Sequence, residues 1–310
     1  MNKKLLVSIT VLFLLYCCKN QKSSVYNLPN PTEDVIYSNI NIALKEADKV
    51  EYLNLRNQEI VTINPEISNL KNLLFLNLMK NKMEQFPEII CELPKLKDLN
   101  IRDNKLTALS DNIGKLNQLQ QLDIAKNKLT TLPAGFGNLK KLLNLFASNN
   151  LLSSLPDNIG SLNQVQFIEL QNNQLTTPGA GFYELNSLVN VNLGNNKITT
   201  IEGALFTNNK KLQVLNLENN ELTSLPDEIS KAKNLNTLIL SFNQIGKLPD
   251  GICDLKNLEM LLLSGNKLSS LPSDISKLTK LKTLIAVNNS FSDEEKARIR
   301  KALPGCDVVL

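Results

Sequence analysis

The sequence has 310 residues, of which 34 are Lys or Arg and 30 are Asp or Glu, and it contains no His and no Trp. The absence of His excludes every catalytic or metal-binding scheme that requires an imidazole. The near balance of charges differs from the basic stripe of nucleic-acid-binding proteins, so we expect no nucleic acid partner. A chain of this length can form two globular domains, but a repeat array grows as one body, and we expect one domain.

The first 18 residues indicate export. A positively charged start precedes the apolar run 5–15, which is too short to span a bilayer as a helix. The next letters, Leu-Tyr-Cys-Cys followed by polar residues, resemble the cleavage box of bacterial lipoproteins, in which a Cys carries the lipid. We therefore predict a lipoprotein signal peptide over 1–18, with Cys18 as the lipidated residue and Cys17 as the second choice. The alternative is an ordinary secretory signal, which would leave a secreted protein.

A tether and a helical cap are expected next. Residues 19–37 contain two prolines and are expected to be extended. In 38–49, apolar residues with the spacing i, i+3, i+4 and i+7 predict a helix, and Ser38 or Asn39 can cap its start. This N-terminal cap would cover the core that the first repeat leaves open, a role that the terminal units of solenoids require.

Residues 50–291 repeat one template, L-x-x-L-x-L-x-x-N-x-L-x-x-L-P-x-x-φ-x-x-L with φ apolar, which Leu119–Leu139 follows closely. Nine of the ten steps between units are 23 residues long, and the step from Leu188 to Leu212 is 24. A fixed period of this kind predicts a solenoid. The eleven units begin at Val50, Leu73, Leu96, Leu119, Leu142, Val165, Leu188, Leu212, Leu235, Leu258 and Leu281.

The template assigns a role to each of its parts. The L-x-x-L-x-L segment alternates, which predicts a short strand with Leu facing inward, and the L-P segment suits the return of the chain because Pro fixes φ. At the ninth position the backbone leaves the sheet, where a side-chain amide can both donate and accept hydrogen bonds. We interpret the Asn residues at this position as a structural ladder; Gln58 fills the first unit, and the others are Asn81, Asn104, Asn127, Asn150, Asn173, Asn196, Asn220, Asn243, Asn266 and Asn289.

Two units in the middle of the chain depart from the template. Pro178 replaces a Leu, and the 24-residue unit has Phe206 at an inward position and Asn209 where Leu is expected. We expect a local change of curvature or a displaced convex loop, and the alternative is a tolerated irregularity without function. After Asn289, Ser292 and Glu295 have capping-box spacing, which predicts a C-terminal cap over 292–310 made of a helix and a last short strand.

Residues 50–289 resemble the leucine-rich repeat family, and in particular its bacterial members that follow a lipoprotein signal. The resemblance implies an α/β solenoid, a right-handed horseshoe with a concave parallel β-sheet that binds partners. Family membership does not identify the partner, because function resides in sites carried by a fold.

No enzymatic site or cofactor is expected. Ser68-x-x-Lys71 and Ser110-Asp111-Asn112 match two of the three elements of a penicillin-interacting serine site, but no Lys-Thr-Gly follows, and we interpret the matches as coincidence.

The cysteines of the repeats and of the C-terminal cap are predicted to be free. Cys91 and Cys253 occupy the same repeat position seven units apart, which places them on the order of 34 Å from each other. A disulfide requires Cα atoms within about 7 Å, so we predict that Cys91, Cys253 and Cys306 are free thiols that burial makes inert.

The outward positions of each repeat, the third, fifth and seventh, form the predicted concave face. Its last three units carry an apolar column, and exposed apolar surface usually marks interaction. The alternatives are that these side chains strengthen the sheet, or that a second copy of the chain covers them. The predicted ligand-binding surface is Ile239, Phe242, Met260, Leu262, Ile285 and Val287, and a secondary surface is Tyr52, Arg56, Phe75, Met79 and Arg102.

Together these features predict a non-enzymatic protein that binds other proteins, is anchored by a lipid to a bacterial envelope at the outer membrane or cell surface, and presents a preformed face to its ligand. Host and matrix proteins are the partners considered first. The alternative is a structural scaffold of a periplasmic or envelope assembly that has no host partner.

Overall fold

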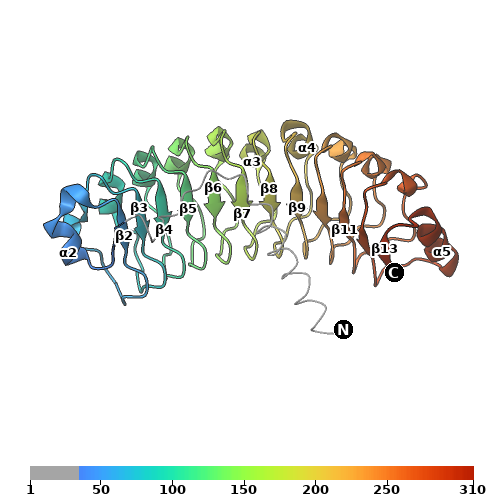
Figure 1. Ribbon diagram of the computed structural model, residues 1–310. Coiled ribbons are helices and arrows are strands. Elements are labelled where there is room, and N and C mark those ends of the chain that lie inside the picture. The colour runs from blue at the N-terminus through green and yellow to red at the C-terminus, as the bar shows by residue number, and fades with distance from the viewer. Residues whose placement is uncertain (1–34) are drawn as a thin grey trace. The chain divides into compact units, whose positions relative to one another are not determined.

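The computed structural model describes residues 35–310. The predictions for the signal peptide, for Cys18 and Cys17 and for the tether up to residue 34 lie outside the described residues. Residues 36–310 form one parallel sheet in which each strand is bonded to its neighbours in the sequence, from β1 to β13. Figure 1 shows this part as a curved stack, with the helical segments along its outer, convex edge. The predicted solenoid with a parallel sheet is confirmed.

Strands and helical turns alternate along the stack. The strands are β1 (Ile36–Tyr37), β2 (Tyr52–Asn54), β3 (Phe75–Asn77), β4 (Asp98–Asn100), β5 (Gln121–Asp123), β6 (Asn144–Phe146), β7 (Phe167–Glu169), β8 (Asn190–Asn192), β9 (Val214–Asn216), β10 (Thr237–Ile239), β11 (Met260–Leu262), β12 (Thr283–Ile285) and β13 (Asp307–Val309). The α-helices are α2 (Ile40–Lys45), α3 (Ala180–Glu184), α4 (Ala204–Asn208) and α5 (Asp293–Ala302). The 3-10 helices are η2 (Ala47–Lys49), η3 (Pro65–Asn69), η4 (Glu88–Glu92), η5 (Asp111–Lys115), η6 (Ala134–Asn138), η7 (Asp157–Ser161), η8 (Asp227–Lys231), η9 (Asp250–Asp254) and η10 (Ile275–Lys277).

The leucines of the template form the core. In every unit the strand occupies the third to fifth positions, so the fourth position faces inward while its two neighbours face the other side. The strands pair without shift, and Leu122 lies between Leu99 and Leu145 of the adjacent strands. All three side chains are fully buried. Equivalent leucines therefore stack in columns along the whole array.

The Asn ladder forms as predicted. In a typical unit, Asn127 Oδ1 accepts a hydrogen bond from Leu106 N at 3.0 Å, and its Nδ2 donates to Ile101 O at 3.1 Å and to Ile124 O at 3.0 Å. One amide thus joins two consecutive repeats and pairs backbone groups that would otherwise be buried without partners.

The eighth position has a property that was not predicted. In all eleven units it adopts a left-handed backbone, with φ between 51° and 67°. Most of these residues are Asn, Asp or Gly, which tolerate that conformation, whereas an aromatic residue there is exceptional. The residues are Asn57, Lys80, Asp103, Lys126, Asn149, Asn172, Asn195, Asn219, Phe242, Gly265 and Asn288.

The two irregular units carry the α-helices α3 and α4 where other units have 3-10 helices. Asn209 is fully buried; its Oδ1 accepts from Leu188 N at 2.9 Å and its Nδ2 donates to Leu185 O at 2.8 Å. Gly181 packs so closely that a Cβ there would lie 1.9 Å from Asp157 O. Asn209 is therefore a second kind of structural amide, which ties the two irregular units together.

The N-terminal cap contains the predicted helix, α2, and one strand that was not predicted. Asn39 Oδ1 accepts from Asn41 N at 2.9 Å, as expected of an N-cap. Ile36 and Tyr37 fall in the segment expected to be a tether, but they form β1 and pair with β2. That part of the prediction is wrong, because the edge of β2 has backbone groups that β1 satisfies.

The C-terminal cap contains the predicted helix and strand, α5 and β13. Ser292 Oγ accepts from Glu295 N at 3.2 Å, which is half of a capping box. The Glu295 carboxylate accepts from Leu271 N at 2.8 Å and from Arg298 Nε at 2.7 Å instead of completing the box. This clamps α5 onto the repeat before it.

The thiols of Cys91, Cys253 and Cys306 are free, as predicted. Cys91 and Cys253 are buried as predicted, but Cys306 lies in the terminal cap and is partly exposed, so the predicted burial is wrong for that thiol. Burial raises the pKa of Cys91 to about 12 and that of Cys253 to about 11. Both therefore stay protonated and weakly reactive at neutral pH.

Candidate protein-binding face

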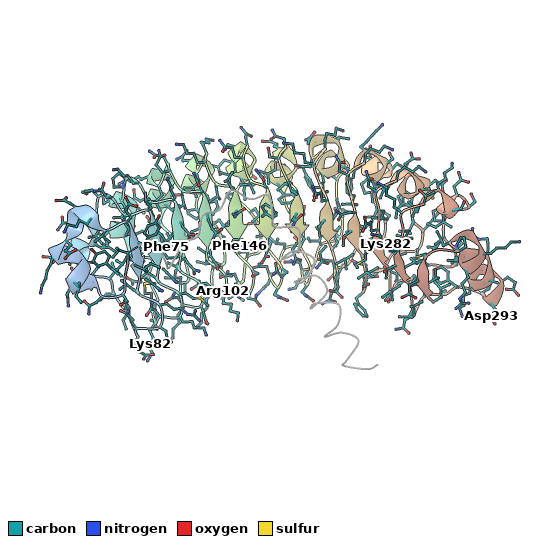
Figure 2. All side chains as sticks on the ribbon, in the orientation of Figure 1. Phe75, Lys82, Arg102, Phe146, Lys282 and Asp293 are labelled. Atoms are coloured by element: carbon teal, nitrogen blue, oxygen red, sulfur yellow. The ribbon has the colours of Figure 1, made fainter. Side chains whose placement is uncertain are left out.

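The concave face is formed by the side chains at the third, fifth and seventh positions of the repeats. Because the strands pair in register, each of these positions forms a column that crosses the sheet. Figure 2 shows Phe75 and Phe146 over the strands, with Arg102 close by. This face contains two contrasting regions, one apolar and one acidic.

The apolar region lies on β10, β11 and β12, where the sequence predicted the ligand-binding surface. Pairing of these strands places Ile239, Leu262 and Ile285 side by side. Ile239 is only 2% exposed and Leu262 only 4%, whereas Ile285 is half-buried. The prediction that the whole column is exposed is therefore wrong for Ile239 and Leu262. Each lies between the side chains of two adjacent strands, about 4.8 Å away on either side.

The remaining members of that surface, Met260, Phe242 and Val287, are half-buried. Phe242 has a φ of 58°, and a Cβ on Gly265 would lie 2.7 Å from its Cδ1 atom. Its ring therefore packs against the backbone of the next repeat, in a conformation that costs a non-Gly residue roughly 1–2 kcal/mol. Whether these residues bind a ligand stays a prediction.

Two buried hydroxyls border Ile239 on β10 and the turn that follows it. Within residues 35–310, Thr237 Oγ1 and Ser241 Oγ have no hydrogen-bond partner. Buried polar groups are nearly always paired, and an unpaired one calls for a physical explanation. The apolar region thus combines hydrophobic side chains with two hydroxyl groups that have no hydrogen-bond partner among the described residues.

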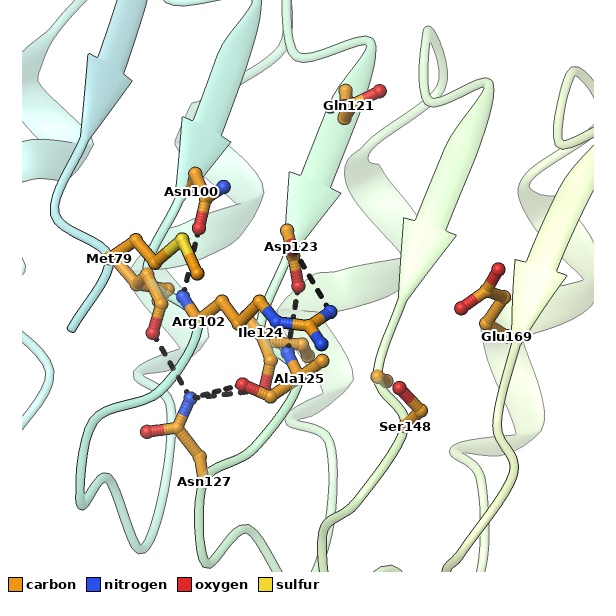
Figure 3. A network of polar contacts seen from close by, with 12 residues as sticks. Met79, Asn100, Arg102, Gln121, Asp123, Ile124, Ala125, Asn127, Ser148 and Glu169 are labelled. Carbon is orange, nitrogen blue, oxygen red and sulfur yellow. Dashed lines mark hydrogen bonds and ion pairs between the residues drawn. The ribbon is translucent and has the colours of Figure 1, made fainter. Parts of the chain in front are cut away.

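The secondary surface is only partly brought together. Tyr52 and Phe75 are directly paired on β2 and β3, and both are half-buried. Arg56, at the seventh position of the first repeat, is exposed. Figure 3 shows Met79 beside Arg102, whose guanidinium points to Asp123 and not to the aromatic pair. Its Nη1 lies 3.9 Å from Asp123 Oδ2.

The acidic region consists of Asp98, Asp123 and Glu169 on β4, β5 and β7. It was not predicted as a group, although the sequence already showed carboxylates at outward positions of nearby repeats. Asp98 is 3% exposed, and its Oδ2 accepts from Gln121 Nε2 at 3.4 Å. The other oxygen, Asp98 Oδ1, is buried and has no hydrogen-bond partner in the part of the chain that the structure describes.

Burial shifts the titration of all three carboxyl groups. Burial, with the nearby Asp123 charge, raises the pKa of Asp98 to about 8. Burial also raises the pKa of Asp123 to about 6, although the Ala125 N–H and the Arg102 guanidinium act against this. The pKa of Glu169 is raised by burial as well. The region is thus rich in carboxyl groups whose charge is poorly compensated.

A metal-binding cluster and a membrane-spanning helix are both absent between residues 35 and 310. This part of the chain has no group of three or more His, Cys, Asp or Glu side chains that could hold a metal ion. It also has no helix that is long and apolar enough to cross a membrane.

Models of two repeat families match the chain. The family described as "Leucine-rich repeat region" matches residues 89–193, and the family described as "Leucine rich repeat" matches 186–245 and 233–291. Together they run from 89 to 291, which is more than half of the 310 residues. No curated protein sequence matches the chain.

Solved structures with the same architecture come from several kinds of organism. The chain is similar to a leucine-rich repeat protein of Leptospira interrogans at 25% identity and a TM-score of 0.50, over 89% of this chain and 100% of that one. It is similar to a TDR receptor at 29% identity and a TM-score of 0.75, over 87% of this chain and 49% of the receptor. It is also similar to the Drosophila Toll–Spatzle complex at 29% identity and a TM-score of 0.70, over 81% and 34%.

Proposed function

Because the chain belongs to the leucine-rich repeat proteins, we propose that it is a non-enzymatic binding protein whose concave face holds a protein partner. The chain spans about half of the TDR receptor and about a third of the chain matched in the Toll–Spatzle complex. In that complex a repeat protein is bound to a second protein, and we propose that this chain likewise binds a protein, although a different one.

The observation that carries this proposal is the state of the polar groups on the concave face. Asp98 Oδ1, Thr237 Oγ1 and Ser241 Oγ are buried and have no hydrogen-bond partner. Leaving such a group unpaired costs about 1–3 kcal/mol, and a bound partner that supplied the missing donors or acceptors would recover that loss.

The scaffold favours binding without rearrangement. Each Asn of the ladder joins consecutive repeats, and the strands are paired over the whole array. A face that is ordered before contact loses little conformational freedom on binding, which lowers the entropic cost of the complex.

We further propose that the protein is exported and anchored by a lipid at Cys18, or at Cys17, on a bacterial outer membrane or cell surface. The support is the sequence of residues 1–18, with its positive start, apolar run and Cys pair. Host and matrix proteins are the proposed partners, because a protein anchored on the cell surface would be exposed to them. Labelling of cells with a radioactive fatty acid should mark the wild-type protein and lose the mark in Cys18→Ser, or in Cys17→Ser if that Cys carries the lipid. An unlabelled wild type would contradict the anchor.

The binding function is tested with an array of extracellular and matrix proteins. Purified protein is applied to the array, and each retained partner is measured again with a Met260→Ser/Ile285→Ser variant. These two side chains are half-buried on the concave face, so the change removes contact area with little loss of core packing. We expect at least a tenfold loss of affinity.

The matched control is Leu151→Ser, which removes an apolar side chain that is 43% exposed and lies outside the concave face. Its affinity for the same partner should equal that of the wild type. Equal affinity of all three proteins would contradict the proposal that the concave face binds the partner.

A further inference from the structure

We propose that the acidic region of the concave face, Asp98, Asp123 and Glu169, recognises a cationic side chain, Lys or Arg, that a protein partner inserts into it. The inference rests on the proposed function and adds to it the chemistry of the partner.

The topology brings the three carboxylates together. Asp98 is paired with Gln121 on the adjacent strand, and Asp123, two residues further along that strand, is its diagonal neighbour on the same face. The charge of Asp123 acts on Asp98, and the charge of Glu169 acts on Asp123. The three groups therefore form one electrostatic site that spans β4 to β7.

The unpaired oxygen of Asp98 indicates which kind of group a ligand would place there. Asp98 Oδ1 is buried and has no partner, while Oδ2 accepts a single long bond from Gln121. In its ionised form the carboxylate oxygen only accepts, so the group that would pair with that form on binding is a donor. A charged N–H donor makes the strongest bond to a carboxylate, about twice as strong as that of a neutral donor.

The charges within the site do not balance. The three carboxyl groups have one cation close to them, Arg102, whose guanidinium lies 3.9 Å from Asp123 at its closest approach. Figure 3 shows Arg102 on the Asp123 side, with Glu169 on the other side of Ser148. A second cation placed between Asp98 and Asp123 would compensate the negative charge that Arg102 does not neutralise.

An aromatic ring and small side chains suit the same ligand. Phe146 is paired with Asp123 on one side and with Glu169 on the other. A Lys or Arg close to the ring face gains a cation–π interaction of about 0.5–1 kcal/mol or more. The seventh positions beside it are Ala125, Ser148 and Gln171. The first two are small and buried, and the Gln171 Nε2 donates to Glu169 Oε2 at 3.3 Å.

The titration of Asp98 supports this assignment. Burial raises its pKa to about 8, so most molecules carry a neutral Asp98 at pH 7. The charged group that acts on Asp98 is Asp123 of the adjacent strand β5, and the outward positions of β3, the other adjacent strand, are uncharged. A bound cation favours the ionised carboxylate, so binding releases a proton. Affinity should then rise by up to about tenfold per pH unit between pH 6 and pH 8.

The probe for the test is a phage-displayed library of random 12-residue peptides, panned on the purified full chain. Peptides that are retained are synthesised, and their affinities are measured by calorimetry at pH 6, 7 and 8. We expect the selected peptides to share a Lys or Arg. Replacing that residue by the neutral norleucine or citrulline should weaken binding at least tenfold.

The protein variant is Asp98→Asn/Asp123→Asn, in which each amide keeps the size of the carboxyl group, and thermal unfolding confirms that it is folded. Affinity should fall at least tenfold and lose its dependence on pH. The matched control, Asp103→Asn, removes a carboxylate of the same repeat at the left-handed eighth position, where Asn is common, and should bind like the wild type.

The outcomes separate this inference from the proposed function. Peptides that lose binding in Met260→Ser/Ile285→Ser but not in Asp98→Asn/Asp123→Asn would overturn the cation site and leave the concave face as the binding surface. Selected peptides that bind both variants like the wild type would contradict the cation site and the proposed function together.

Discussion

Two regions of the concave face, on β4–β7 and on β10–β12, share one scaffold and differ in almost every outward residue. The first holds two buried carboxyl groups, Asp98 and Asp123, and the half-buried Glu169, with one unpaired carboxyl oxygen; the second holds an apolar column with two unpaired hydroxyls. In both, the inward leucines are buried and the Asn amides make the same hydrogen bonds. The difference shows that the template determines stability and that the outward positions determine what each region can bind.

The largest effect is expected from the scaffold and should be equal in both regions. Asn127→Ala and Asn243→Ala each remove an amide that joins two repeats, and each leaves buried backbone groups unpaired. We expect each variant to lose about 2–4 kcal/mol of unfolding free energy. Urea unfolding measures it. A loss twice as large in one region as in the other would show that the scaffold is not uniform.

The next effect distinguishes the acidic region. The pKa of Asp98 is raised from an ordinary 3.8 to about 8 in the folded chain, so its contribution to stability is complete below pH 3.8 and is lost as the pH rises through 8. Asp98→Asn should therefore match the wild type at pH 4 and exceed it at pH 9 by about 2 kcal/mol or more.

Urea unfolding at the two pH values checks this expectation. Ser241→Ala in the apolar region serves as the control, because removal of a hydroxyl changes no titration between these pH values. If the difference in unfolding free energy between Asp98→Asn and the wild type were the same at both pH values, the raised pKa of Asp98 would be contradicted.

The smallest effect concerns the apolar region. Phe242→Asn places at the left-handed position the residue that most other repeats have there. Relief of backbone strain favours the variant by roughly 1 kcal/mol, although it loses the contact of the ring with Gly265. We expect a small rise in melting temperature together with weaker binding of the partner, which would show that strain at Phe242 is retained for binding. A loss of both stability and binding would instead assign the ring a structural role.

Much of the fold was predictable because it repeats. The strands, the inward leucines, the Asn ladder and the helices of both caps follow from spacing alone. The strand formed by Ile36 and Tyr37 was missed, because two residues are too few for a periodic signal. Asn209 was recognised only as a departure from the template, with a local change of curvature or a displaced convex loop expected; the structure shows the carbonyl of Leu185 to which its amide donates.

The binding face was less predictable, because exposure depends on side chains of adjacent strands. Ile239 and Leu262 alternate outward as predicted, yet the neighbours that bury them lie about 23 residues away in the chain. The acidic region was missed for the same reason. Asp98 and Asp123 lie in separate repeats of the sequence, and their raised pKa values arise from their packing in the sheet.

The most direct test of a concave binding face is site-specific photocrosslinking to a retained partner. Benzoylphenylalanine is placed at Phe146, an aromatic position of that face, or at Leu151, an exposed position of the same repeat outside it. We predict that the partner crosslinks from position 146 and not from position 151. Crosslinking from 151 alone would contradict the account.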